Sequence, residues 1–147
     1  MSIVALWLAV VFLPLLSAHG HEKSKPPGDF VLVTNAKNGV PSRSVSIAKV
    51  LSGRSDRWPD GTKAVLVLPP AGSPAMRWLS EDALGMPEKM LRRFLLQQVF
   101  RGAVPRPIEA RSVAQAVDIL RNHRGALAVL TPGTVQGDRG LKILELP

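Results

Sequence analysis

Two short runs of the sequence contain only apolar residues. They are 64–68 (AVLVL) and 126–130 (ALAVL), and both have the length of a β-strand. A strand without a polar position has no face suited to solvent, so both faces of its sheet must be covered. These runs therefore predict an α/β layered fold in which helices flank a mixed sheet.

The rest of the chain alternates strand and helix signals. Strands are expected at 30–34, 64–68, 126–130 and 141–146, which makes a sheet of about four strands. Helices are expected to begin at Ser44, Pro74, Pro87 and Ser112, where serine caps or prolines precede apolar periodicity. Their expected inward side chains are Trp78, Leu79, Ala83 and Leu84 in the second helix, Met90, Leu91, Phe94, Leu95 and Val99 in the third, and Val113, Ala116, Val117 and Leu120 in the fourth. One domain, residues 30–147, follows from this pattern.

The N-terminal twenty residues differ from all that follows. They contain no Asp, Glu, Lys or Arg, residues 3–16 are almost wholly apolar, and Ala18 and Gly20 have the small-x-small spacing of a signal-peptidase site. We interpret 1–20 as a signal peptide, with a retained anchor helix as the alternative. Residues 21–29 are expected to form a flexible leader, and the exported chain is expected in the periplasm.

Composition narrows the classes of partner. The chain has no cysteine, which excludes a lipid-anchored lipoprotein, disulfides, thiolate catalysis and sulfur-based zinc sites. Its net charge of +8 favours anionic partners. Nucleic acid is not expected, because the basic residues are dispersed, tyrosine is absent and other aromatic side chains are few.

Catalytic and metal-binding patterns are weak. No Ser-His-acid set, paired carboxylates or metal quartet is evident from local spacing, so no catalytic residues, cofactor or enzymatic activity are predicted. If the signal peptide is cleaved near Ala18 or Gly20, His19 or His21 would lie at the new amino terminus and could chelate a metal. A terminal site with two or three ligands does not indicate a function. No functional metal site is predicted.

Several short sequence motifs in the chain occur in the order found in one protein family. FVLVTN is followed by AKVLSGRSDRWPDG, then by VLPPAGSPAMRWL, by Phe100-Arg101-Gly102 and by a strand beginning at Gly125. Together they resemble one lobe of the periplasmic phosphate-binding proteins that serve ABC transporters, over residues 30–146. The resemblance implies a lobe of the type II periplasmic binding protein fold and a non-catalytic role in binding a small anion.

The phosphate-binding turn of that family aligns with Ala71-Gly72-Ser73-Pro74-Ala75. The resemblance implies an anion site at Gly72, Ser73 and Ala75, with Arg77 one turn into the helix as a source of charge. The turn departs from the family pattern at Pro69, which replaces arginine, at Pro74, which has no N–H to donate, and at Ala75, which has no hydroxyl. The alternative interpretation is that Ser73 simply caps its helix.

The sequence is compatible with two functions. The first is an exported solute-binding-like domain that holds phosphate or a similar anion weakly at a helix N-terminus. The second is a scaffold or accessory module that binds an envelope protein, or a second copy of itself, through the face where another lobe would dock. The loop containing Trp58 is a further candidate for docking, although packing of Trp58 onto the core is the preferred interpretation.

Overall fold

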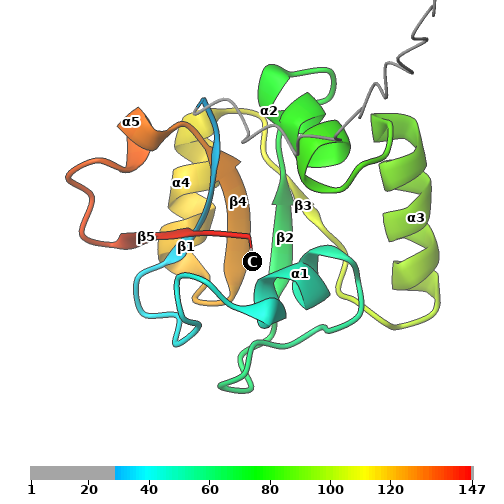
Figure 1. The fold of residues 1–147 in the computed structure, drawn as a ribbon, viewed down its shortest axis with the longest axis horizontal. Helices are drawn as coiled ribbons and strands as arrows, with labels where there is room; N and C mark the ends of the chain where they lie inside the picture. Colours follow the sequence, from blue (N-terminus) through cyan, green and yellow to red (C-terminus); the bar gives the residue numbers. More distant parts are fainter. Residues whose placement is uncertain (1–28, 147) are drawn as a thin grey trace, which may run out of the picture.

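The computed structural model describes residues 29–146, so the predicted signal peptide and most of the leader lie outside the described residues. A five-stranded mixed sheet has helices on both faces, which confirms the predicted α/β architecture (Figure 1). The elements are β1 (Val31–Asn35), α1 (Val45–Leu51), β2 (Val65–Leu68), α2 (Pro74–Arg77), the π-helix η1 (Trp78–Ala83), α3 (Glu88–Phe100), β3 (Ile108–Glu109), α4 (Val113–Asn122), β4 (Ala126–Leu130), α5 (Pro132–Val135) and β5 (Leu141–Leu144).

The sheet has the strand order β3-β2-β4-β1-β5. β2 runs parallel to β3 and β4, whereas β1 is antiparallel to both β4 and β5. The fifth strand, β3, was not expected: Ile108 lies in a proline-rich connection and pairs with Val67 of β2. A two-residue strand is too short to give a sequence pattern, and only its tertiary pairing defines it.

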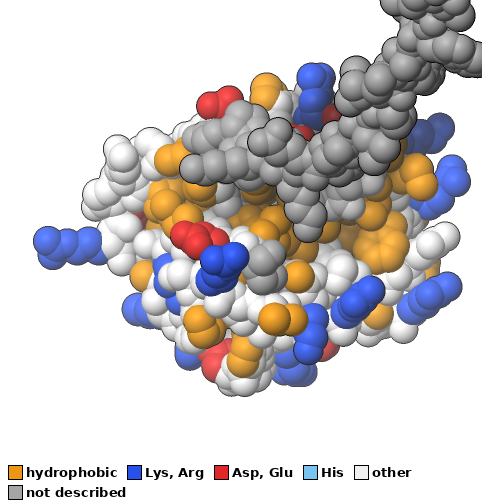
Figure 2. All heavy atoms as spheres, viewed as in Figure 1, with side chains coloured by type: hydrophobic (Ala, Val, Ile, Leu, Met, Phe, Trp, Pro, Cys, Tyr) orange, Lys and Arg blue, Asp and Glu red, His pale blue; other side chains and the backbone are white. Residues whose placement is uncertain are grey.

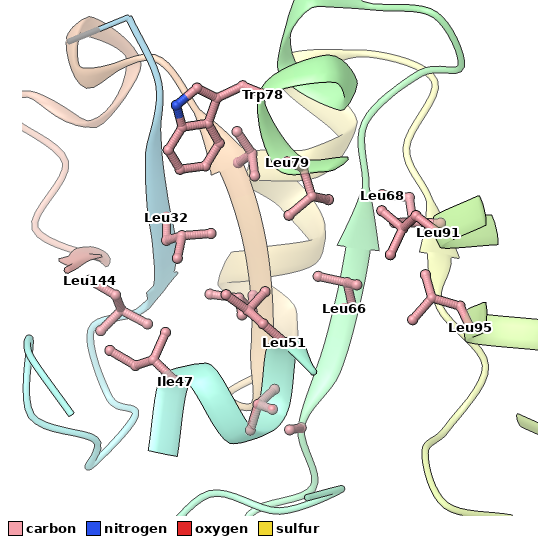
Figure 3. Packing of buried hydrophobic residues seen from close by; sticks show 14 of the residues in the cluster. Leu32, Ile47, Leu51, Leu66, Leu68, Trp78, Leu79, Leu91, Leu95 and Leu144 are labelled. Carbon is pink, nitrogen blue, oxygen red and sulfur yellow. The ribbon is translucent and has the colours of Figure 1, made fainter. Parts of the chain in front are cut away.

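Side chains alternate between two cores along the central strands, one on each face of the sheet. Leu66 and Leu68 of β2 belong to the cluster under α1, η1 and α3, whereas Val67 belongs to the cluster under α4 and α5. Figure 3 shows Leu66 and Leu68 pointing with Leu51, Leu79 and Leu91 into the first of these cores. The apolar runs of β2 and β4 are therefore explained by burial on both faces.

Two side chains expected to face inward are exposed instead. Met90 is 60% exposed. Leu91 and Leu95 form the buried face of α3, and Met90 points about 100° away from its neighbour Leu91. Val113 is 55% exposed, because it opens α4 ahead of the residues that reach the core, Ala116 and Leu120. Helical spacing predicts which residues share a face, but at the borders of a stripe only tertiary packing decides burial.

Packing of Trp58 onto the core is confirmed. Its side chain is 2% exposed, and its indole N–H donates to the Gly125 carbonyl at 2.9 Å. A tight turn follows it, in which the Gly61 N–H donates to the Trp58 carbonyl at 2.9 Å. Within residues 29–146, every helix is too short or too polar to cross a membrane.

Candidate functional site

Three parallel strands end at one edge of the sheet. β3, β2 and β4 lie side by side in that order and run in the same direction, and a helix begins shortly after each of them. α2 and α5 are seen in Figure 1 at the end of the sheet toward which β2 and β4 point. In open α/β sheets, ligands bind outside the carboxyl ends of the strands, where the connections diverge. Binding groups are therefore expected at this edge.

A shallow surface hollow of about 430 Å³ lies at this edge, between the segments that follow β2 and β3. It is lined by Pro69, Pro70, Ala71, Glu109, Ala110 and Arg111. Beside it is a smaller apolar void of about 40 Å³ between the strand ends and the first turns of α2 and α4. The hollow is open to solvent and combines apolar walls with one carboxylate and one guanidinium.

The predicted anion turn borders this hollow. The Ser73 N–H donates to the Pro70 carbonyl at 3.1 Å, which closes a four-residue turn. Gly72 occupies the third position with φ of +70°, a left-handed conformation that glycine adopts without a steric penalty. The sequence Pro-Ala-Gly-Ser thus forms a tight turn that delivers the chain directly to the start of α2.

Ser73 caps the helix. Its Oγ accepts a hydrogen bond from the Met76 N–H at 3.2 Å, and Pro74 occupies the first helical position. The capping contact offered as the alternative interpretation is thus formed, and it uses one acceptor of the hydroxyl while leaving its hydrogen available. The Ala75 N–H belongs to the first turn of α2, where N–H groups have no partner within the helix.

The Gly72 N–H points at a carboxylate of the protein itself. It donates to Glu88 Oε2 at 3.1 Å, while Glu88 Oε1 accepts from Arg92 Nε at 2.9 Å. Arg92 also binds Glu109 at the end of β3, with an N–O distance of 2.8 Å. This chain of contacts joins α3 to the segments after β2 and β3, and it places an oxyanion at the turn where a phosphate was expected.

The network favours the ionised form of Glu88. The Arg92 guanidinium, and after it the Gly72 N–H, lower the pKa of the Glu88 carboxyl below its ordinary value, against an opposing effect of burial. The same contact with Glu88 raises the pKa of Arg92, and Glu109 adds to this effect. Both side chains are therefore charged at neutral pH, and Glu88 presents a full negative charge to Gly72.

The structure brings three of the four predicted ligand residues together. Gly72, Ser73 and Ala75 belong to a single turn and the helix start that follows it. Arg77 lies one turn along α2 on the exposed surface, and within residues 29–146 its guanidinium forms no hydrogen bond with that turn. It supplies positive charge nearby but is not held against Gly72 or Ser73.

Four charged residues around the turn and the hollow were not identified as site residues from the sequence: Glu88, Arg92, Glu109 and Arg111. The pairing of Glu88 with Arg92 could have been found from their four-residue spacing on one helix, which favours an ion pair. The contact of Arg92 with Glu109 and the position of Arg111 at the hollow had no local signal, because both depend on how β3 pairs with β2. Over residues 29–146, no group of three or more His, Cys, Asp or Glu side chains is placed to hold a metal ion.

Comparisons with known proteins give matches among solved structures only. No family model and no curated protein matches the sequence. The fold is similar to an ABC-type phosphate transport receptor from Vibrio cholerae, with a TM-score of 0.57 and 14% identity over 80% of this chain and 46% of that chain. It is also similar to a candidate phosphate ABC transporter substrate-binding protein, solved with bound phosphate, from Clostridium perfringens, with a TM-score of 0.58 and 12% identity over 80% of this chain and 44% of that chain.

These matches concern the fold. The chain spans less than half the length of either protein, and the identity is too low to transfer individual site residues. The mixed sheet flanked by helices corresponds to one lobe of a binding protein, as the resemblance in the sequence implied. Over the described residues, the chain has a fold similar to one lobe of ABC-transporter substrate-binding proteins.

Proposed function

We propose that this protein is an exported, non-catalytic recognition domain that binds phosphate or a similar small oxyanion weakly at the turn after β2. The proposed ligand groups are Gly72, Ser73 and Ala75, with Arg77 contributing charge. Support comes from the fold and from the position of this turn at the edge of the sheet where α/β proteins bind ligands. The apolar segment at residues 3–16 supports export to the periplasm.

One observation supports the anion most directly: the Gly72 N–H already holds a carboxylate oxygen, that of Glu88, at 3.1 Å. A backbone N–H that accommodates one oxyanion presents the same donor to another, and the Ser73 hydroxyl and the Ala75 N–H lie within the next three residues. The proposed ligand must displace Glu88 or share its donor. This competition, together with the absence of an N–H at Pro74, makes millimolar affinity the expectation.

An amide NMR titration with phosphate at low salt tests the proposal, with sulfate as a second anion. Saturable shifts centred on Gly72, Ser73 and Ala75 are expected. Ser73→Ala should abolish them, whereas Ser112→Ala should retain them. Ser112 is a matched control, because its Oγ caps α4 through the Gln115 N–H at 3.1 Å and its loss costs similar stability, about 1 kcal/mol. Unchanged amides at Gly72 and Ser73 at phosphate concentrations well above the expected millimolar Kd would reject anion binding here.

A second candidate function is a protein-interaction module. The observation that favours it is the exposed apolar surface at the same edge, formed by Pro70, Ala71 and Val113, the last of them 55% exposed. Such a surface suits another lobe-like partner, including a second copy of this chain. Sedimentation velocity over a range of protein concentrations separates the two functions: self-association weakened by Val113→Ser and indifferent to phosphate supports the module.

A further inference from the structure

The outward surface of α3 has an unusual composition. Leu96 is 56% exposed, Met90 is 60% exposed and Phe100 is 83% exposed. Lys89 and Arg93 are exposed between them. Lys89, Arg93, Leu96 and Phe100 follow spacings of four, three and four residues, so they form one stripe along the helix. We call this stripe, with Met90 beside it, the outer face of α3.

The outer face lies opposite the part of α3 that builds the core. Leu91 and Leu95 are almost fully buried, and Phe94 packs partly against the same cluster. The exposed apolar side chains are therefore not required to hold α3 in place. Within the described fold nothing covers Phe100, the most exposed of the large hydrophobic residues.

The exposed charges of this helix are all of one sign. From 88 to 101, the exposed charged residues are Lys89, Arg93 and Arg101, while the acid of this segment, Glu88, is partly buried against Arg92 and Gly72. Figure 2 shows Lys and Arg side chains along the edge of the molecule where α3 lies in Figure 1, with hydrophobic side chains beside them. The outer face thus combines positive charge with projecting apolar groups.

We propose that the outer face of α3 binds an anionic lipid surface, with α3 lying parallel to it. Leu96 and Phe100 enter the boundary between head groups and acyl chains, and the aliphatic stems of Lys89 and Arg93 keep their charges at the head groups. A projecting helix face fits a planar membrane, whereas the hollow and the void described above lie at the ends of the parallel strands. This peripheral contact is separate from the anion turn at Gly72.

The contact is expected to be reversible and sensitive to salt. Only three large apolar side chains project from α3, so their burial must act together with attraction to anionic lipid. Each Lys or Arg near a negative surface contributes about fivefold to partitioning, and this contribution falls within a Debye length. Neutral vesicles should therefore bind the outer face much more weakly than anionic vesicles.

A fluorescent label on α3 of the full chain tests the contact. Because the chain has no cysteine, Leu96→Cys introduces a unique thiol for an environment-sensitive dye, and Val113→Cys provides a matched exposed position on α4. Both labelled proteins have the same apolar segment at 3–16, so attachment through it affects them equally. A blue shift and several-fold brightening at position 96 alone is expected with phosphatidylglycerol–phosphatidylcholine vesicles, reversed by salt and absent with pure phosphatidylcholine.

Charge reversal provides the second arm. In the Leu96→Cys protein, Lys89→Glu with Arg93→Glu should lower the partitioning reported by the dye at position 96 by more than an order of magnitude, whereas Arg139→Glu, an exposed arginine in the loop before β5, should leave it nearly unchanged. Equal dye responses at positions 96 and 113, an equal dye response at position 96 with neutral vesicles, or no response would each overturn the proposal. A response to polyglutamate but not to vesicles would also overturn it and assign the outer face to an acidic protein.

Discussion

The backbone N–H of Gly72 and the Glu88 carboxylate are joined by a 3.1 Å hydrogen bond that connects the turn after β2 to the first residue of α3. The same carboxylate is held on its other oxygen by Arg92. An internal anion therefore occupies one donor of the proposed ligand site. Any external oxyanion at this turn competes with Glu88, and this competition can be measured.

Removing the charge of Glu88 should strengthen phosphate binding. In Glu88→Gln the neutral amide competes less well for the Gly72 N–H and no longer repels the ligand, so the Kd for phosphate should fall about fivefold, which corresponds to about 1 kcal/mol. Glu109→Gln is the matched control, because Glu109 also pairs with Arg92 but does not contact Gly72. Equal effects of the two substitutions in NMR titrations would indicate a general charge effect instead of competition at Gly72.

Glu88 should also make the fold sensitive to acid. Arg92 and Gly72 lower the pKa of Glu88 below its ordinary value of 4.5, so the folded state holds this proton less tightly than the unfolded chain does. The resulting stability is fully present above pH 4.5 and is lost as the pH falls through the folded-state pKa. After allowance for partial exposure, it amounts to about 0.5 kcal/mol.

Urea unfolding of wild type and Glu88→Gln from neutral to acidic pH measures this contribution. The difference in unfolding free energy between the two proteins should shrink on acidification. Asp60 and Asp138 also have lowered pKa values, through Thr62 and Arg121 respectively, but they are present in both proteins and cancel in the difference. A difference that stays constant with pH would show that Glu88 is not held as its ionised form.

The helices and strands that could be predicted from the sequence are those specified by residues close together in the chain. Ser44 and Ser112, which were expected to cap their helices, and Ser73, for which capping was the alternative interpretation, each accept a hydrogen bond at the start of a helix. The apolar runs of β2 and β4 became central strands of the sheet. In these cases, capping and periodicity act within a few residues of one another and so leave a readable pattern.

The site was less predictable, because its contacts join distant segments. Glu109 is brought within reach of Arg92 by the pairing of β3 with β2. The sequence around β3 showed no strand pattern, so this contact could not be predicted. The π-helical turns of η1 likewise bury Trp78, Leu79 and Ser80 in succession, which ordinary helical spacing does not anticipate. Sequence periodicity indicated where helices and strands begin and end. Which side chains come into contact at their ends depends on tertiary pairing.

Substitution of Gly125 should be strongly destabilising. A Cβ at this position would lie 1.8 Å from the Lys63 carbonyl oxygen, and backbone must move to relieve the clash. Gly125→Ala should lower the unfolding free energy by about 3 kcal/mol, as for severe overpacking. Gly133→Ala is the control, because nothing lies within 4 Å of a Cβ placed there. Thermal unfolding that is unchanged in Gly125→Ala would contradict the close approach of Lys63.

Asn35 connects the end of β1 to the end of α4. Its Nδ2 donates to the carbonyls of Leu120 at 2.8 Å and Arg121 at 3.1 Å, and its Oδ1 accepts from the Lys37 N–H at 2.8 Å. The last carbonyls of a helix have no partner within it, so this buried amide satisfies groups that would otherwise be unpaired. Asn35→Ala should lower the unfolding free energy by about 2 kcal/mol and speed hydrogen exchange in the last turn of α4.

Two companion substitutions separate this helix cap from simple loss of a buried amide. Asn38→Ala also removes a buried amide, but that amide binds Thr34 and Val40, so exchange in α4 should not change. Asn35→Asp would direct a carboxylate at two carbonyl oxygens, so its proton should be held more tightly in the folded state, and the variant should gain stability relative to wild type as the pH falls. This direction is opposite to that expected for Glu88. If Asn35→Asp instead lost stability on acidification, the side chain would be acting as an acceptor and not as the donor that closes α4.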